Sequence, residues 1–333
     1  MLRTAIVGLG WWGQTLVNAV HGKSDALRFV AAQVRNPARA EAFAGERGIT
    51  LHARIEDVLA DPSIDAIVLA TPHSEHARMI GLAAGAKKHV FCEKPFTLDL
   101  ASADQALDAV RKAGVVVGVG FQRRFPPAIG EIRKRIKDGS LGILNHCEGE
   151  ATAPAGLVMA KESWRANAEE TPAGAMTALG VHVLDGLIDL AGEIDEVYCV
   201  NVRRASALVD DTTNVMIRFK SGATGALMCC LTTAPSYRIA VWGSKQYAEA
   251  SRPMLDVLRV SHVSSGPPGT PPREAELIET KGFDPIKAEL EAFAAAAQGG
   301  APYPIPPAEI RHGVAAFEAI VRSSKEGKPV KVA

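Results

Sequence analysis

The chain has 333 residues, 47% of them hydrophobic and 22% charged, which suits a soluble globular protein long enough for two domains. Lysine plus arginine and aspartate plus glutamate both total 37, so no net charge draws the chain to nucleic acid or to an anionic membrane surface. No apolar stretch reaches the roughly 20 residues of a membrane span. We expect a small-molecule partner, with no nucleic acid and no membrane.

The cysteines and the amino terminus bear on the cellular compartment. An odd number of scattered cysteines argues against a disulfide framework and favours buried thiols in a reducing compartment; they are Cys92, Cys147, Cys199, Cys229 and Cys230. Residues 1–4 run directly into a strand pattern, which leaves no room for a signal peptide. We therefore expect a cytoplasmic protein, and no ligand cluster predicts a metal site.

The first predicted elements form a strand, a glycine turn and a helix. An apolar strand at residues 4–7 leads into Gly8-Leu9-Gly10-Trp11-Trp12-Gly13, and a helix pattern follows to about Val20. Gly8 permits the tight turn, Gly10 lets the backbone approach a pyrophosphate, and Gly13 lets the helix pack closely on the strand. This order predicts a dinucleotide site at the helix N-terminus, the alternative being a glycine turn with only a structural role.

The end of the second predicted strand, residues 28–34, bears on the choice of cofactor. An acidic residue at this position binds the 2′-hydroxyl of an NAD ribose. The chain instead has Val34 followed by Arg35, which favours the 2′-phosphate of NADP. Stacking of Arg35 on the adenine is the alternative, and it would serve NADP or NAD equally.

The next predicted strand, residues 65–70, is almost continuously apolar and thus typical of a buried parallel sheet. It ends at Thr71 and Pro72, where ligands of an open α/β sheet collect, so these two residues are expected to line the cofactor. His73 and His76 follow, and for each we expect a solvated histidine in a loop or at a helix start.

A predicted helix at residues 74–86 and a strand at 88–92 lead to Glu93-Lys94-Pro95. Pro95 favours an extended conformation for Lys94, so the amine projects from a fixed place at a strand end. A partly desolvated lysine there can hold a substrate oxygen and assist proton transfer. A further helix at 101–113 and a strand at 115–119 complete a doubly wound parallel sheet.

The second half begins with Gln122-Arg123-Arg124-Phe125, the expected crossing into another domain. A strand at residues 142–150 precedes the irregular segment 151–174, a candidate substrate lid that carries Trp164 and Arg165. In the predicted helix 176–191, His182, Asp185 and Asp189 share one face. A solvated polar face is the simplest reading of that trio, and catalysis by His182 with Asp185 orienting its imidazole is the functional one.

Residues 196–249 alternate in strand fashion, with turns at Ser221-Gly222 and Gly243-Ser244, which predicts a largely antiparallel sheet. Helices cover one face, and a second subunit is the simplest cover for the other. Residues 264–272 have the composition of a surface loop, and helices are expected at 284–297 and 307–325.

Together these motifs resemble the Gfo/Idh/MocA oxidoreductases. The resemblance rests on the glycine loop, residues 65–72, Glu93-Lys94-Pro95, Gln122-Arg123-Arg124-Phe125, Trp164-Arg165 and residues 180–185. It implies an α/β fold with an N-terminal Rossmann domain at residues 1–121. A C-terminal substrate-binding domain at 122–333 would follow, built on a large, mostly antiparallel open sheet that often forms the subunit interface. We therefore expect a homodimer or homotetramer.

The resemblance also implies roles for individual residues. Lys94 becomes the active-site lysine and His182 the acid/base, while Ala178 stands where many members have an aspartate. The implied cofactor contacts are Gly8, Leu9, Gly10, Trp11, Trp12, Gly13, Arg35, Ala70, Thr71, Pro72, His76, Glu93, Lys94, Gln122 and Arg165. The implied substrate contacts are Lys94, Arg123, Trp164, Arg165 and His182.

The expected function is hydride transfer between a nicotinamide and a secondary alcohol or ketone of a sugar, cyclic polyol or related compound. Two alternatives stay open. One is a non-catalytic NAD(P)-binding regulator of the same fold, which the alanine at position 178 favours. The other is a glycosidase that uses tightly bound NAD.

Overall fold

The computed structural model describes residues 1–264, 266–267, 270 and 273–333. It divides into two compact units, residues 1–122 with 284–314 and residues 123–283 with 315–333. Residues 284–314 thus belong to the first unit, although the sequence analysis assigns them to the second domain. Part of the predicted surface loop, residues 265, 268–269 and 271–272, lies outside the described residues.

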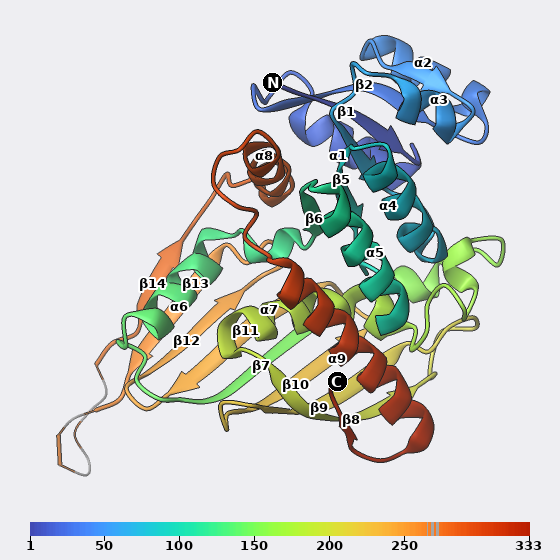
Figure 1. The fold of residues 1–333 in the computed structure, drawn as a ribbon. Coiled ribbons are helices and arrows are strands. Elements are labelled where there is room, and N and C mark those ends of the chain that lie inside the picture. The colour runs from blue at the N-terminus through green and yellow to red at the C-terminus, as the bar shows by residue number, and fades with distance from the viewer. Residues whose placement is uncertain (265, 268–269, 271–272) are drawn as a thin grey trace. The chain divides into compact units, whose positions relative to one another are not determined.

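The first unit is built on a six-stranded parallel sheet, sheet A, with strand order β3-β2-β1-β4-β5-β6 (Figure 1). The strands are β1 (Leu2–Val7), β2 (Leu27–Gln33), β3 (Thr50–His52), β4 (Ala66–Leu69), β5 (His89–Glu93) and β6 (Val117–Gly120). The helices are α1 (Trp11–Val20), α2 (Glu41–Glu46), α3 (Ile55–Ala60), α4 (His76–Gly85), α5 (Leu100–Ala113) and α8 (Pro285–Ala297). This is the predicted doubly wound arrangement. Because the strands are parallel, the carboxyl ends of β1, β4, β5 and β6 lie at the same edge of the sheet.

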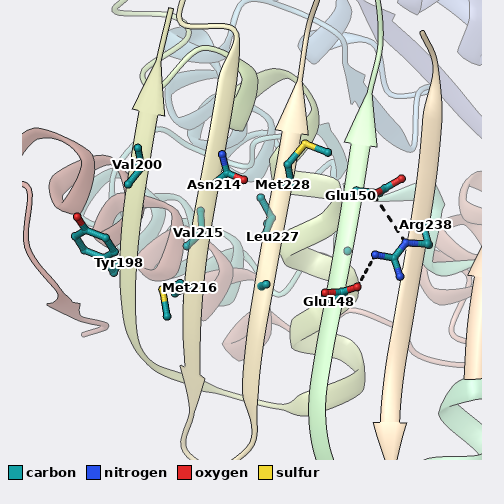
Figure 2. A pocket seen from close by; sticks show the side chains of 12 residues that line it. Glu148, Glu150, Tyr198, Val200, Asn214, Val215, Met216, Leu227, Met228 and Arg238 are labelled. Carbon is teal, nitrogen blue, oxygen red and sulfur yellow. Dashed lines mark hydrogen bonds and ion pairs between the residues drawn. The ribbon is translucent and has the colours of Figure 1, made fainter. Parts of the chain in front are cut away.

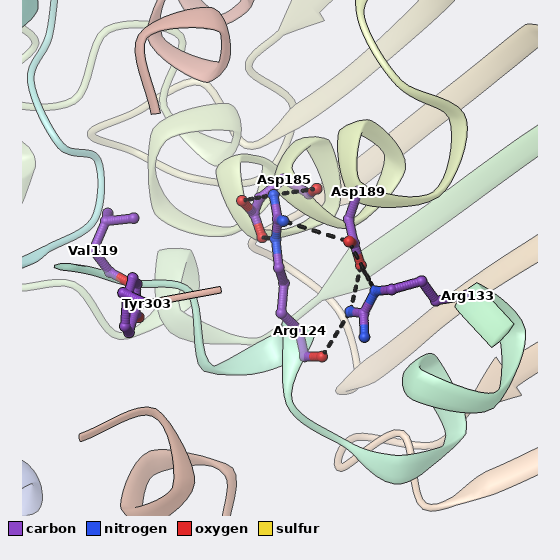
Figure 3. Close-up of polar contacts among 6 residues, drawn as sticks. All are labelled: Val119, Arg124, Arg133, Asp185, Asp189 and Tyr303. Carbon is purple, nitrogen blue, oxygen red and sulfur yellow. Dashed lines mark hydrogen bonds and ion pairs between the residues drawn. The ribbon is translucent and has the colours of Figure 1, made fainter. Parts of the chain in front are cut away.

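Local sequence signals explain several of these boundaries. The Asp99 side chain accepts a hydrogen bond from the Ser102 backbone N–H and caps α5, and Gly114 ends that helix at φ +69°. The Asp284 side chain caps α8 in the same way, with Pro285 in its first turn. Inside the unit, the Tyr303 hydroxyl donates to the Val119 carbonyl oxygen at 2.7 Å (Figure 3), which attaches the segment after α8 to β6.

The second unit is built on a nine-stranded sheet, sheet B, with order β14-β13-β12-β11-β7-β10-β9-β8-β15. Neighbouring strands are antiparallel except for the parallel pair β7 and β10. The strands are β7 (Leu144–Thr152), β8 (Ile194–Val202), β9 (Thr212–Phe219), β10 (Thr224–Cys230), β11 (Ser236–Gly243), β12 (Gln246–Ser251), β13 (Val257–His262), β14 (Glu276–Glu279) and β15 (Val330–Lys331). The sequence predicted this mostly antiparallel sheet correctly.

Helices α6 (Pro127–Lys137) and α7 (Val181–Ala191) lie against one face of sheet B (Figure 1), and α9 (Pro307–Glu326) runs from the first unit into the second. Close approach of α7 requires Gly149 in β7, because an added Cβ would lie 2.5 Å from the Val183 side chain. The alternating residues Glu148 and Glu150 therefore point to the other face. A single π-helical stretch, Met176–Gly180, precedes α7, so the predicted continuous helix over 176–191 is interrupted.

The face of sheet B opposite α7 has a hollow of about 290 Å³ (Figure 2). Apolar side chains line much of it, and Met216 and Val200 are 69% and 46% exposed. Beside them Arg238 forms ion pairs with Glu148 at a short distance and with Glu150 at 3.8 Å. In the described part of the chain, this face exposes large apolar side chains to solvent. Such an exposed apolar surface is unusual for an isolated subunit.

Several chain-wide features complete the description. All five cysteines are free thiols and four of them are buried. Burial raises the pKa of Cys147, Cys199 and Cys229 to about 12, so these three thiols stay protonated at neutral pH. Within the described part of the chain, no helix has both the length and the apolar character needed to cross a membrane.

Candidate active site

The glycine loop lies at the carboxyl edge of sheet A, between β1 and α1. Gly8 has φ +92°, and an added Cβ there would lie 2.5 Å from the Ala70 carbonyl oxygen. At Gly13 an added Cβ would lie 2.1 Å from the Gly8 carbonyl oxygen. Nothing lies within 4 Å of a Cβ added to Gly10. Two glycines are therefore required by packing, and the third faces open space of the kind that a pyrophosphate fills.

Several side chains of the first unit bury polar atoms for which no hydrogen bond is found among the described residues, and three of these atoms come from elements at the carboxyl edge of sheet A. They are the Trp12 indole Nε1, the Thr71 Oγ1 and the Gln122 Oε1. Trp12 lies in the first turn of α1, Thr71 follows β4, and Gln122 follows β6, so all three belong to the same sheet edge. Because a buried polar group without a partner costs free energy, a ligand that supplies the missing partners fits this edge. A nicotinamide dinucleotide carries both hydrogen-bond donors and acceptors and meets that requirement.

His76 joins two loops at this edge. Its Nδ1 lies 2.9 Å from the Pro95 carbonyl oxygen and its Nε2 lies 3.3 Å from the Thr71 carbonyl oxygen. The side chain is completely buried, and His73 is 8% exposed. The prediction that these histidines are solvated is therefore wrong, although each does begin a helical turn. His76 links the loops after β4 and β5, because its two ring nitrogens each contact a backbone carbonyl oxygen of one loop.

Glu93 and Lys94 end β5 as predicted. The Glu93 carboxylate is buried and accepts a hydrogen bond from the Lys94 backbone N–H at 3.2 Å. It also fills the space beside Gly120, where an added Cβ would lie 2.7 Å from Oε1. Lys94 itself is half-buried, which suits a cation that meets a ligand. Burial and the Glu93 charge raise the pKa of the neighbouring Cys92 thiol, so Cys92 is not a nucleophile.

The residues after β2 bear on the adenosine end of a dinucleotide. Val34 is buried, while Arg35 is exposed. No ion pair to Arg35 is found among the described residues, so its guanidinium is available for an anion.

The predicted catalytic trio lies on α7 in the second unit. His182 is 8% exposed and Asp185 is 6% exposed, and the Asp189 side chain is 9% exposed. A solvated polar face is therefore wrong for these three residues. Burial of the two carboxylates on this helix requires partners, and two arginines from other elements supply them.

Figure 3 shows both arginines. The Arg124 guanidinium binds both Asp185 carboxylate oxygens, with Nε to Oδ2 at 2.8 Å and Nη2 to Oδ1 at 2.7 Å. Arg133, from α6, binds the Asp189 carboxylate in the same forked manner, at 2.6 Å to Oδ2. Arg124 was singled out only as part of a motif, and sequence reasoning missed its pairing because the partners are 61 residues apart.

Arg123 and Tyr237 form a second contact near this helix. The Arg123 guanidinium lies 4.9 Å from the centre of the Tyr237 ring and donates a hydrogen bond to the Pro253 carbonyl oxygen. The Tyr237 hydroxyl is buried without a hydrogen-bond partner among the described residues. Burial raises the pKa of this phenol, which stays protonated and can donate. Sequence reasoning did not find Tyr237, because a tyrosine within an alternating strand carries no distinguishing signal.

The predicted lid carries Trp164 and Arg165 in one 3₁₀ turn, with the Arg165 guanidinium 4.2 Å from the centre of the Trp164 ring. Arg165 is exposed, and the Thr171 hydroxyl donates to its carbonyl oxygen at 3.0 Å. Ala178 lies within the π-helical stretch. Among the described residues, no group of three or more histidines, cysteines and acids is placed to bind a metal ion.

Comparison with known proteins agrees with this geometry. Residues 2–121 match the oxidoreductase family with an NAD-binding Rossmann fold, and residues 129–249 match the GFO/IDH/MocA C-terminal domain. An uncharacterized oxidoreductase of Bacillus subtilis (strain 168) is 32% identical over 78% of this chain and 76% of its own length. The chain belongs to the Gfo/Idh/MocA oxidoreductase family. The predicted family is thereby confirmed.

Another relative and two solved structures match nearly the whole chain. The inositol 2-dehydrogenase of Rhizobium meliloti (strain 1021) is 29% identical over 100% of this chain and 99% of its own length. A putative NADPH-dependent oxidoreductase from Desulfitobacterium hafniense has a TM-score of 0.91 at 22% identity, with 99% of this chain and 97% of that chain covered. Levoglucosan dehydrogenase in complex with NADH has a TM-score of 0.89 at 23% identity, covering 100% and 99%. These two structures share the fold.

Proposed function

We propose that this chain is an NAD(P)-dependent dehydrogenase that transfers a hydride between nicotinamide and a secondary alcohol or ketone of a sugar, cyclic polyol or related compound. The carrying observation is the sheet edge where open space at Gly10 adjoins the unpartnered polar atoms of Thr71 and Gln122, with Lys94 at the next strand end. Dehydrogenases among its relatives support hydride transfer over the regulator and glycosidase alternatives. Residues 1–121 would hold the cofactor, and residues 122–333 would hold the substrate.

The bound nicotinamide supplies hydride chemistry, and the chain supplies orientation and the proton path. Lys94 holds the reacting oxygen and stabilises negative charge that develops on it. His182 exchanges the proton of the same hydroxyl group, because an imidazole titrates near neutral pH. The glycine loop and the first-turn N–H groups of α1 orient the cofactor phosphates. Arg123, Trp164 and Arg165 are the proposed substrate contacts.

The cofactor preferred by the chain is proposed to be NADP. Val34 removes the acid that would bind a ribose 2′-hydroxyl, and the exposed Arg35 guanidinium can bind a 2′-phosphate. Fluorescence titration with NADPH and NADH tests this preference. Tighter binding of NADH would refute it while leaving the dehydrogenase proposal in place.

Lys94→Ala and His182→Ala test the chemistry. Each should lower kcat by about 10²-fold to 10⁴-fold, the usual contribution of acid/base groups. Affinity for the reduced cofactor should change much less than kcat, because an interaction made mainly in the transition state lowers kcat and leaves ground-state binding largely intact. Lys112→Ala and His21→Ala are matched controls, because Lys112 lies on the exposed side of α5 and His21 is exposed at the end of α1. Full turnover in both test variants would refute the assignment.

We also propose that a second copy of the chain covers the open face of sheet B, giving a homodimer or a homotetramer. Burial of large apolar side chains such as Met216 contributes about 1.5–3 kcal/mol each, and this face leaves Met216 and Val200 in solvent. Met216→Glu should therefore produce a smaller species by light scattering. Ile143→Glu is the control, because Ile143 is 74% exposed and does not line the hollow. A monomeric parent protein would overturn the proposal.

A further inference from the structure

The Arg124 side chain is buried against α7 beside the proposed proton-exchanging residue. The side chain is 4% exposed, and the forked contact of its guanidinium occupies both carboxylate oxygens of Asp185 (Figure 3). Nη2 also donates to the Asp185 backbone carbonyl at 3.3 Å. Asp185 lies three residues after His182, a spacing that makes two side chains neighbours on a helix. The nearest acid on the helix of His182 is therefore already paired with a cation.

We propose that Arg124 is a positioning residue that sets the protonation of His182 by pairing with the Asp185 carboxylate. This inference rests on the proposed role of His182. With the pair intact, the negative field of Asp185 at the imidazole is largely cancelled by the guanidinium. His182 is thereby kept ready to exchange a proton near neutral pH, and is not held permanently protonated by a free carboxylate next to it.

The pairing of charges continues along the helix. Asp189 lies one turn further on, and Arg133 binds both of its oxygens while Arg124 Nη1 approaches it at 3.4 Å. Two arginines thus meet two aspartates, and the cluster has no net charge. Arg133 also donates to the Arg124 carbonyl oxygen at 3.3 Å, which fixes the backbone that carries the inner arginine.

Other elements packed against α7 within this unit add few ionisable groups. Arg123, from the same turn as Arg124, is directed to the Pro253 carbonyl and the Tyr237 ring. Tyr237 from β11 and Cys229 from β10 are both buried, and burial raises both of their pKa values. Both groups are consequently neutral at physiological pH. Along α7, the charged pair closest to His182 within this unit is therefore Arg124–Asp185.

Opposite changes at the two partners give a test that a purely structural role would fail. Arg124→Gln leaves the Asp185 carboxylate unpaired and should raise the pKa of His182 by about one unit. Asp185→Asn removes the carboxylate that balances the Arg124 cation and leaves Arg124 its 3.4 Å contact with Asp189, so it should lower the imidazole pKa by a similar amount. The double variant should restore the wild-type value, and Arg124→Lys should stay close to it because the charge is kept. The imidazole pKa is followed by NMR titration of the apo protein, without reference to turnover.

Arg133→Gln is the matched control. It removes the forked partner of Asp189, which lies seven residues from His182, about 10 Å along the helix axis. The Arg133 side chain is also 43% exposed. The His182 titration should therefore move much less than in Arg124→Gln. If Arg124→Gln proves unfolded, Asp185→Asn and the double variant carry the same test, because neither leaves a buried carboxylate unpaired.

The outcomes separate this inference from the proposed function. Opposite shifts in the two single variants, with the acid limb of kcat/KM moving by the same amount, support both. Opposite shifts with an unmoved kcat/KM limb support the pairing and refute proton exchange by His182. An unchanged His182 titration in folded Arg124→Gln or Asp185→Asn, or shifts of the same sign, would overturn the inference.

Discussion

Replacement of Gly10 by alanine separates cofactor binding from folding. Gly10 is the N-cap of α1, with φ −73° and ψ −172°, a conformation that alanine adopts without strain. An added Cβ would meet no atom of the described structure within 4 Å. The methyl group would instead project into the space assigned to the pyrophosphate. Gly10→Ala should therefore weaken cofactor binding and leave the protein folded.

The expected magnitudes follow from this geometry. Alanine is a poorer N-cap than glycine by less than about 1 kcal/mol, and the stiffer unfolded chain returns roughly 0.4–1 kcal/mol. The net change in unfolding free energy should be below about 1 kcal/mol, which is at most about 4 °C in Tm. Displacing the pyrophosphate from contact with the backbone should raise the Kd of NADPH at least tenfold, about 1.4 kcal/mol.

Gly13→Ala provides the contrast on the same loop. Its added Cβ would lie 2.1 Å from the Gly8 carbonyl oxygen, so the backbone must move. Overpacking of this kind costs about 1–3 kcal/mol, and the higher helix propensity of alanine returns about 1 kcal/mol at most. Gly13→Ala should therefore lower Tm as well as affinity. Thermal unfolding of the apo proteins and tryptophan quenching by NADPH measure both quantities, and wild-type affinity in Gly10→Ala would refute the pyrophosphate placement.

Three further substitutions have defined outcomes. Arg35→Ser should weaken NADPH binding about tenfold or more and leave NADH binding unchanged, because a charge-assisted hydrogen bond is worth roughly 1.5–3 kcal/mol; equal losses for both cofactors would indicate adenine stacking. Tyr303→Phe should lower the unfolding free energy by about 1 kcal/mol, because the buried Val119 carbonyl keeps a second donor, the backbone N–H of residue 121; an unchanged Tm would contradict this. Burial of Asp211 favours a higher pKa, but hydrogen bonds from the backbone N–H groups of residues 204–206 and other donors lower it overall. The ionised carboxylate thus stabilises the fold above the unfolded-state pKa of about 3.9, and this contribution is lost as pH falls through the lower native pKa. Asp211→Asn should cost about 1–3 kcal/mol at pH 7, and denaturant melts should show the deficit shrinking below about pH 4; a deficit independent of pH would exclude a charge effect.

Sequence patterns alone located the nucleotide half of the candidate site. Strand, glycine turn and helix follow one another within 20 residues, and each has a local signal that does not depend on the rest of the chain. Lys94 could be placed for the same reason, since a strand pattern ends directly before it. The alternating pattern of residues 196–249 likewise predicted sheet B, because side chains in strands repeat every two residues.

Tertiary structure decided what these residues contact. Arg124 and Asp185 are 61 residues apart, and no local pattern selects one partner among the many charges of the chain. His76 is buried because the Thr71 and Pro95 carbonyls meet at the ends of neighbouring strands, although its sequence context predicts a solvated helix start. The π-helical stretch before α7 leaves no periodic signal, and an apolar helix such as α8 does not specify which unit it joins. Local periodicity therefore determined the elements, whereas hydrogen bonding and burial between distant segments determined the environment of each polar group.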